Sequence, residues 1–223
     1  NKWVRYRVVF RWFTNPNLPG PTHITITEEG RVFGHIAEWS ACHIGYEGVC
    51  VAPPQSEVDY AYFATGQVLL DDGSAAKTGV ISLGGGHARD GMRVQPVLSH
   101  YDSTSTGVAD VAVGEDEHGI WCAGWIRPGT TEEQVIALRA SDVSGDWREI
   151  RGNLELVAAL AVNVGGFPTV SVGVENGVQV SLVAAGAVRG YDDDDIIESL
   201  AEKVEHSLAA RQSRRERMQE LAT

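Results

Sequence analysis

The chain has 223 residues, which is enough for one large domain or two small ones. Its formal net charge of -12 repels phosphate backbones and argues against nucleic acid as a main partner. A composition of 43% hydrophobic and 22% charged residues is typical of a soluble globular protein, and no apolar run is long enough to span a membrane. The start at Asn1 rather than Met fits proteolytic trimming and a start set by cloning equally well.

The three cysteines are an odd number, so at least one of Cys42, Cys50 and Cys122 is left out of any internal disulfide. This count favours a reducing compartment. Cys42 and Cys50 are close enough in sequence to form a buried pair or a disulfide that closes a small loop. Zinc would accept His43 and His87 beside them, but structural zinc sites usually have more tightly spaced ligand pairs. We therefore expect neither a metal nor a cofactor.

The first half of the chain shows several β-type patterns. Residues 3–13 are rich in aromatic and β-branched residues, which predicts a strand. Residues 22–39 alternate as a hairpin does. Residues 40–91 are irregular and Gly-rich, with short strands predicted at 67–70 and 78–83. Long loops between short strands are therefore expected here.

Further strand patterns follow towards the middle of the chain. Residues 94–100 and 108–113 both look extended. The polar turn "GEDEHG" comes next, and residues 120–126 return as a strand with a period of two. We expect the last two of these segments to form a hairpin.

A helix is predicted over residues 129–140, where Thr130 and Glu133 have the spacing of a capping box. The "SDVSGDWR" stretch at 141–148 contains ordinary turn dipeptides and is predicted as a loop. Residues 154–164 are apolar enough for a buried strand or a buried helix, and periodicity alone does not decide between them.

The end of the chain differs in character from the rest. Residues 170–188 have β-type alternation with many small residues. An amphipathic helix is predicted over 194–221, because acidic residues precede it, basic residues end it, and apolar residues recur every three to four positions. We therefore expect a main domain over 1–190 and a helical tail over 191–223.

Nucleophilic catalysis is the chemistry that the sequence favours most. A serine needs a neighbouring base, and that base needs a third group to fix its tautomer. Ser144 lies in the predicted loop, and the histidines best placed to serve it are His43, His87 and His100. His100 is preferred because it ends a strand-like run, although a solvent-exposed histidine at a strand end would look the same.

Several separated motifs now suggest a family. The stretches "RVFGHIAEW", "GGGHA", "SHYDSTSTGVADVAVGEDEHGIW", "SGDWR" and "LELVAALAVNVGGFP" lie between about Trp12 and Pro168. In this order they resemble the head maturation (prohead) proteases of tailed actinobacterial phages. That family is related in fold to the herpesvirus assemblins. The resemblance implies an α+β, β-dominated fold, a closed antiparallel β-barrel with flanking helices, and favours a strand for 154–164.

The resemblance also assigns catalytic roles to residues of this chain. It makes Ser144 the nucleophile, His100 the general base and Glu155 the third member. His87 competes for the third role, because the assemblins use a second histidine there, and Asp146 is a further contender.

The function that the resemblance implies is a serine endopeptidase of phage head maturation. Backbone N–H groups near Gly145, or the side chain of Arg148, would bind the oxyanion of the tetrahedral intermediate. The expected substrates and partners are the scaffolding protein, a removable segment of the major capsid protein, and the protease itself, with a homo-oligomer left open. The expected location is the assembling prohead in the host cytoplasm, with retention in the virion left open.

The alternative is a non-catalytic structural or minor capsid protein that keeps a protease-like fold. It would dock through the C-terminal helix, whose apolar stripe needs a partner helix or groove.

Overall fold

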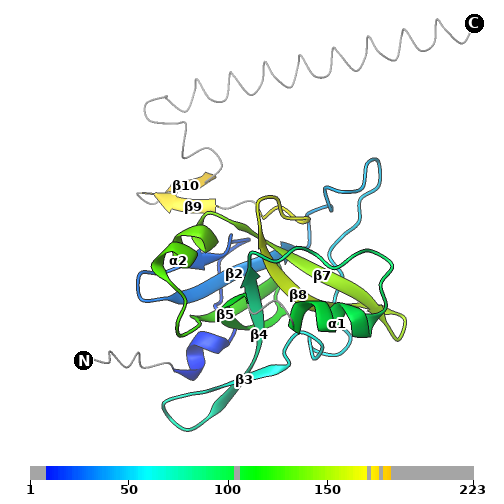
Figure 1. Cartoon of the computed structure of the whole chain (residues 1–223). Helices are drawn as coiled ribbons and strands as arrows, with labels where there is room; N and C mark the ends of the chain where they lie inside the picture. The colour runs from blue at the N-terminus through cyan, green and yellow to red at the C-terminus, as the bar shows by residue number, and fades with distance from the viewer. Residues whose placement is uncertain (1–8, 103–105, 170–171, 176–177, 182–223) are drawn as a thin grey trace, which may run out of the picture. The chain divides into compact units, whose positions relative to one another are not determined.

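A computed structural model describes residues 9–102, 106–169, 172–175 and 178–181 of the chain (Figure 1). The described part is α+β and dominated by strands. Its elements are η1 (Phe10–Phe13), β1 (Thr25–Ile26), β2 (Arg31–Glu38), β3 (Gly66–Leu69), β4 (Ala75–Leu83), α1 (Val94–Asp102), β5 (Gly107–Glu115), β6 (Gly119–Ile126), α2 (Glu132–Arg139), β7 (Asp142–Ile150), β8 (Asn153–Val162), β9 (Val172–Glu175) and β10 (Val178–Ser181). Within it, no helix is long and apolar enough to cross a membrane.

The main sheet has the strand order β1-β2-β6-β5-β4-β8-β7, and β3 pairs with residues 75–78, the first part of β4. The pairs are antiparallel except β4 and β8, which run parallel over Ile81–Leu83 and Ala159–Ala161. β9 and β10 form a separate two-stranded sheet. Two edges of the main sheet, β1 and β7, have no ladder partner on their outer side among the described residues.

The expectation of a closed antiparallel barrel is therefore wrong, because the sheet is an open, curled half-barrel. β2 and β7 approach each other, but no strand ladder joins them. Loop segments fill this position instead. The Ile44 N–H donates to the Gly166 carbonyl at 2.9 Å, and the Thr169 hydroxyl donates to the His35 carbonyl at 3.4 Å. The long connection after β2 and the turn after β8 thus lie where a closing ladder would run.

β8 explains why residues 154–164 carry no clear periodicity. It lies between β4 and β7, and seven consecutive residues from Glu155 to Ala161 are buried. A strand covered on both faces reads as a continuous apolar run rather than an alternation. The strand that the family resemblance favoured is confirmed.

The other strand predictions are confirmed in most places and wrong in two. The hairpin at 22–39, the strands near 67–70 and 78–83, and the pair at 108–126 all form. In the predicted strand 3–13, the described end is instead the 3-10 helix η1, Phe10–Phe13.

Residues 94–102 form the helix α1 rather than an extended segment. Val94, Val97, Leu98 and Tyr101 recur at helical spacing, and Val97 is fully buried. Leu98 and Tyr101 pack with it against the buried side chains of Ala88 and Val157. The strand was predicted from the local content of apolar residues, whereas the spacing of those residues, every three to four positions, is that of a helix.

The second helix, α2, forms where predicted but begins one residue later than its predicted cap. Thr131, not Thr130, accepts a hydrogen bond from the Gln134 N–H, and the Gln134 side chain accepts from the Thr131 N–H. The capping box is thus present with its register moved by one residue. The predicted tail helix at 194–221 lies outside the described residues.

A side-chain pair links the two edges of the open sheet. His23, just before β1, lies 3.5 Å from Asp142, the first residue of β7. The hydrogen bond to Asp142 raises the pKa of His23, against burial, which lowers it. Burial raises the pKa of Asp142, but hydrogen bonds from His23 and from the N–H groups of Val143 and Gly165 outweigh it, so the net pKa is lowered. Both partners are therefore charged over a range of mildly acidic pH.

His23→Gln should lower the free energy of unfolding by about 1 kcal/mol at about pH 5.5. The raised pKa of His23 means that its contribution is complete below the ordinary value of 6.5 and is lost as pH rises through the folded-state pKa. Urea unfolding at about pH 5.5 and about pH 9 should therefore show a difference from wild type that shrinks at the higher pH. His118→Gln is the control, because its partner Glu117 is 86% exposed. An equal deficit for His23→Gln at both pH values would contradict the pairing.

Candidate active site

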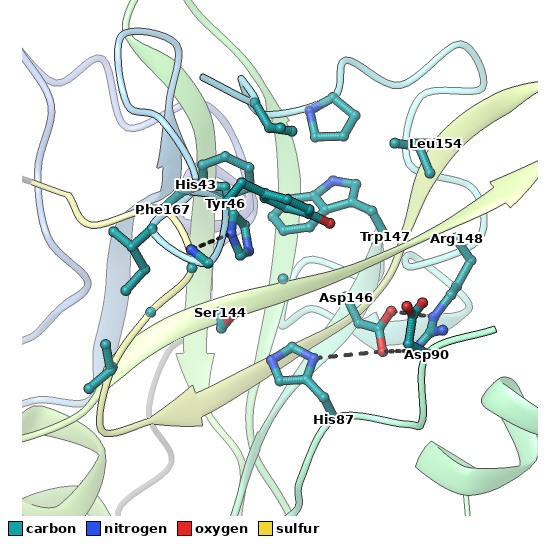
Figure 2. Close-up of a pocket in the computed structure, with 18 of the residues that line it drawn as sticks. His43, Tyr46, His87, Asp90, Ser144, Asp146, Trp147, Arg148, Leu154 and Phe167 are labelled. Atoms are coloured by element: carbon teal, nitrogen blue, oxygen red, sulfur yellow. Dashed lines mark hydrogen bonds and ion pairs between the residues drawn. The ribbon is translucent and has the colours of Figure 1, made fainter. Parts of the chain in front are cut away.

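A cleft of about 570 Å³ opens along the edge strand β7 (Figure 2). Five consecutive β7 residues, 144–148, line it. Because successive strand residues point to opposite faces, the cleft follows the strand's edge rather than one face of the sheet. Three loop segments complete it: residues from the connection after β2, from the loop before α1, and from the turn after β8. Their lining members are His43, Ile44, Gly45, Tyr46, Val51, Pro54, His87, Ala88, Asp90, Val164, Gly165, Gly166 and Phe167.

Ser144 lies within β7, so the prediction of a loop at 141–148 is wrong. β7 pairs with β8 along its whole length, with Ser144 opposite Leu160. The hairpin turns instead at Arg151 and Gly152, which have φ of 55° and 93°. Two consecutive residues with positive φ are characteristic of the tight turns that join twisted strands. The "SG" and "GD" dipeptides thus lie in a strand whose true turn comes later.

Ser144, His87 and Asp146 meet in this cleft. Ser144 and Asp146 are two residues apart on β7 and are 7% and 5% exposed. Figure 2 shows the imidazole of His87 between them, and its Nδ1 lies 3.7 Å from Asp146 Oδ2. Within the described part of the chain, the Ser144 hydroxyl makes no hydrogen bond. A hydroxyl, an imidazole and a carboxylate are therefore brought to one place by two segments.

Asp146 is surrounded by hydrogen-bond donors. Arg148 contacts both of its oxygens through Nε and Nη2, and the Tyr101 hydroxyl donates to Oδ2. Burial raises the pKa of Asp146, but the nearby His87 and the hydrogen bonds from Arg148 and Tyr101 outweigh it and lower the net value. The carboxyl group is consequently ionised at neutral pH and suited to hold an imidazole N–H.

Arg148 also fixes the loop that carries His87. Its guanidinium donates to the carbonyls of Ala88 at 2.9 Å and Arg89 at 3.1 Å. The Tyr101 hydroxyl accepts from the Ala88 N–H at 3.0 Å, so both backbone groups of Ala88 are held. With its donors used in this way, Arg148 acts on the position of the loop. The structure does not present it as an oxyanion ligand.

His100 does not line the cleft. It lies in the last turn of α1, and its Nε2 donates to the Gly86 carbonyl at 2.9 Å. Its ring also contacts Tyr101 edge to face. His100 therefore supports the residue before His87, whereas the sequence assigned it to Ser144 directly.

Glu155 is also placed away from the cleft. It is 1% exposed and accepts hydrogen bonds from the Ser56 hydroxyl, from the Glu57 N–H at 2.9 Å and from Asn153 Nδ2 at 2.8 Å. Burial raises the pKa of Glu155, but these hydrogen bonds outweigh it and lower the net value. The carboxylate thus holds the connection around residue 56 onto β8, and the geometry does not join it to His100 or Ser144.

Sequence reasoning missed the role of residues 42–51 in this site. Cys42 and Cys50 form a disulfide, one of the two alternatives considered, and Cys122 is free and buried. The disulfide does not match the expectation of a reducing compartment. His43 Nδ1 accepts from the Gly45 N–H at 3.0 Å, and its ring packs edge to face on Phe167.

No group of three or more potential metal ligands occurs in the parts of the chain that the structure describes.

Comparison with known proteins finds no family model, no curated protein and no solved structure that matches the chain. The site is therefore interpreted from its own geometry, together with the motif resemblance in the sequence.

Gly145→Ala should destabilise the protein by about 1–3 kcal/mol, because it overpacks the floor of the cleft. A Cβ on Gly145 would lie 2.3 Å from Cη2 of Trp147, whose ring packs across it. Gly86→Ala is the matched control, since a Cβ there meets nothing within 4 Å. Chemical unfolding of both variants measures the difference. Equal stability of the two would show that the Trp147 ring moves aside at little cost.

Glu155→Gln should lower stability by about 1–2 kcal/mol at neutral pH, because an amide replaces a carboxylate that accepts three hydrogen bonds. The lowered pKa of Glu155 means that this contribution is present above the ordinary value of 4.5 and is lost as pH falls through the folded-state pKa. Unfolding of the variant and of Glu149→Gln, an exposed β7 position, should show the loss only for Glu155. A deficit that persists unchanged in acid would contradict this role.

Proposed function

We propose that the protein is a serine endopeptidase in which Ser144 is the nucleophile, His87 the general base and Asp146 the group that orients the base. One observation carries the proposal: the His87 ring lies between Ser144 and Asp146 in a cleft (Figure 2). The family resemblance in the sequence supports the same reaction class and the same serine.

The geometry supports a simple sequence of proton transfers. His87 takes the Ser144 proton through Nε2 as the hydroxyl oxygen attacks the scissile carbonyl carbon. Asp146 stabilises the imidazolium from the Nδ1 side. His87 then protonates the leaving amine as the C–N bond breaks and an acyl-enzyme forms. Water, deprotonated by His87, releases the acid and restores Ser144. The 3.7 Å separation of His87 and Asp146 is of the kind that shortens when substrate binds.

The proposal changes two assignments made from the sequence. His87, first considered for the third position, becomes the base, and Asp146 replaces Glu155. The reason is physical: Glu155 is fully engaged with residues 56, 57 and 153, whereas Asp146 contacts the histidine that lines the cleft. His100 becomes a positioning residue, because it holds the Gly86 carbonyl beside His87.

For the biological substrates we retain the proposal that the motif resemblance gave. These are the scaffolding protein, a removable segment of the major capsid protein, and the protease itself, cleaved inside an assembling prohead in the host cytoplasm. The shape of the site supports a polypeptide substrate, because the cleft runs along an edge strand whose outer side has no ladder partner among the described residues.

A second candidate is the structural or minor capsid role with a retained protease-like fold. One observation favours it: the Ser144 hydroxyl has no hydrogen bond to any base within the described part of the chain. In that case the cleft would bind another capsid component without cleaving it.

The deciding experiment is the intact mass of capsid and scaffolding proteins co-expressed with wild type or with single variants. Ser144→Ala should abolish processing, and His87→Ala and Asp146→Asn should each slow it by about 100-fold or more. Glu155→Gln and His100→Gln, compared at equal amounts of folded protein, should retain most of it. Loss of processing with His100→Gln but not with His87→Ala would return the base to His100. Identical masses for wild type and Ser144→Ala would favour the structural role.

A further inference from the structure

The cleft has two chemically different ends: in Figure 2, His43, Tyr46 and Phe167 lie on one side of the β7 ribbon, and Ser144, His87 and Asp146 lie on the other. The polar end holds His87, Asp90, Asp146 and Arg148. The other end is formed by the disulfide-closed loop and by the turn after β8. Among its described lining residues there is no Asp, Glu, Lys or Arg. The catalytic chemistry proposed above uses only the polar end, so the apolar end needs its own explanation.

Large apolar side chains at this end are exposed rather than buried. Ile44 is 53% exposed, Tyr46 58% and Val164 70%. They come from two separate segments and all line the same cleft. Scattered single apolar residues on a surface are ordinary, but several that converge on a concave site mark a place where a ligand binds.

This apolar end is held in shape before any ligand arrives. The Cys42–Cys50 disulfide closes the loop, and the His43 N–H donates to the Val51 carbonyl at 2.9 Å. The Ile44 N–H donates to the Gly166 carbonyl at 2.9 Å and so joins the loop to the turn after β8. Because the backbone is fixed, little conformational entropy is lost when a ligand contacts these side chains.

An aromatic floor lies beneath the exposed side chains. Phe167 is 4% exposed, and its ring centroid lies 4.9 Å from that of His43 and 5.4 Å from that of Trp147. Both neighbours meet Phe167 edge to face. A floor of packed rings beneath an apolar rim suits the side chain of an aliphatic or aromatic residue and disfavours a charged one.

We propose that this end of the cleft is the specificity subsite and that it takes a bulky apolar side chain of a polypeptide, next to the bond that Ser144 cleaves. The inference rests on the proposed function, because the nucleophile places the scissile bond beside it. The polypeptide is favoured as occupant because the apolar side chains line a hollow beside Ser144 instead of forming a flat face. Specificity is thus set by residues 44, 46 and 164, which lie outside the proposed triad.

The test uses the full chain and a set of eight-residue peptides that differ at one position, with Leu, Phe, Gly, Asp or Lys there. Wild type is assayed for cleavage, and Ser144→Ala is assayed for peptide binding without turnover. Val164→Lys is the test variant, since its side chain is 70% exposed and the change leaves the core intact. Leu69→Lys is the matched control, because Leu69 is 77% exposed on β3, away from the cleft. A fluorophosphonate probe reports whether Ser144 is reactive in each form.

Leu and Phe peptides should be cleaved and bound at least about tenfold better than Asp, Lys or Gly peptides. Val164→Lys should remove most of this preference while labelling of Ser144 is unchanged, and Leu69→Lys should behave as wild type. Cleavage that depends on Ser144 but has no apolar preference would overturn the subsite and leave the proposed function standing. Selective binding by Ser144→Ala without cleavage by wild type would support the subsite and overturn the proposed function. Neither binding nor cleavage would overturn both.

Discussion

The carboxylate of Asp146 is the group on which the candidate site depends. A buried ionised carboxylate is costly unless it has partners, and here Arg148 and Tyr101 donate hydrogen bonds to it while His87 lies 3.7 Å away. These donors come from β7, from α1 and from the loop between β4 and α1. One charge therefore fixes a strand, a helix and a loop relative to each other. Arg148 also donates to the carbonyl of Ala88. The guanidinium that pairs with the ionised Asp146 therefore also helps to hold the loop that carries His87.

The open edge of the sheet is the second requirement. The cleft follows β7, an edge strand with no ladder partner on its outer side among the described residues. The two ends of the sheet are linked by the His23–Asp142 pair, by one hydrogen bond between two loops, and by the Thr169 side chain, which donates to β2. The residues that form the apolar rim belong to the same loops, so closure of the fold and shaping of the site use the same segments.

The sequence predicted most strands and the helix α2, because these depend on local pattern. The motif resemblance singled out Ser144, and the structure places Ser144 in the cleft. The prediction was wrong at α1, because it relied on apolar content and not on the helical spacing of the apolar residues. It was also wrong at β7, because dipeptides that are typical of turns occur there inside a strand. It also placed Glu155 at the site. Carboxylates on neighbouring strands look alike in sequence, and only the pairing of β7 with β8 shows that Asp146 faces His87 while Glu155 faces residue 56. Long-range geometry of this kind leaves no local signal.

The parallel pairing of β4 with β8 has a consequence for when the cleft forms during folding. Ile81 and Ala159 are partners although α1, β5, β6, α2 and β7 lie between them in the chain. Contacts between residues this far apart in sequence form late, because the chain loses the entropy of closing a long loop before the contacts stabilise it. The cleft needs this step, since His87 follows β4 and Ser144 is held by β8. A newly made chain would therefore bring Ser144 and His87 together only when folding is nearly complete; under the proposed function, this delay would protect neighbouring proteins from early cleavage.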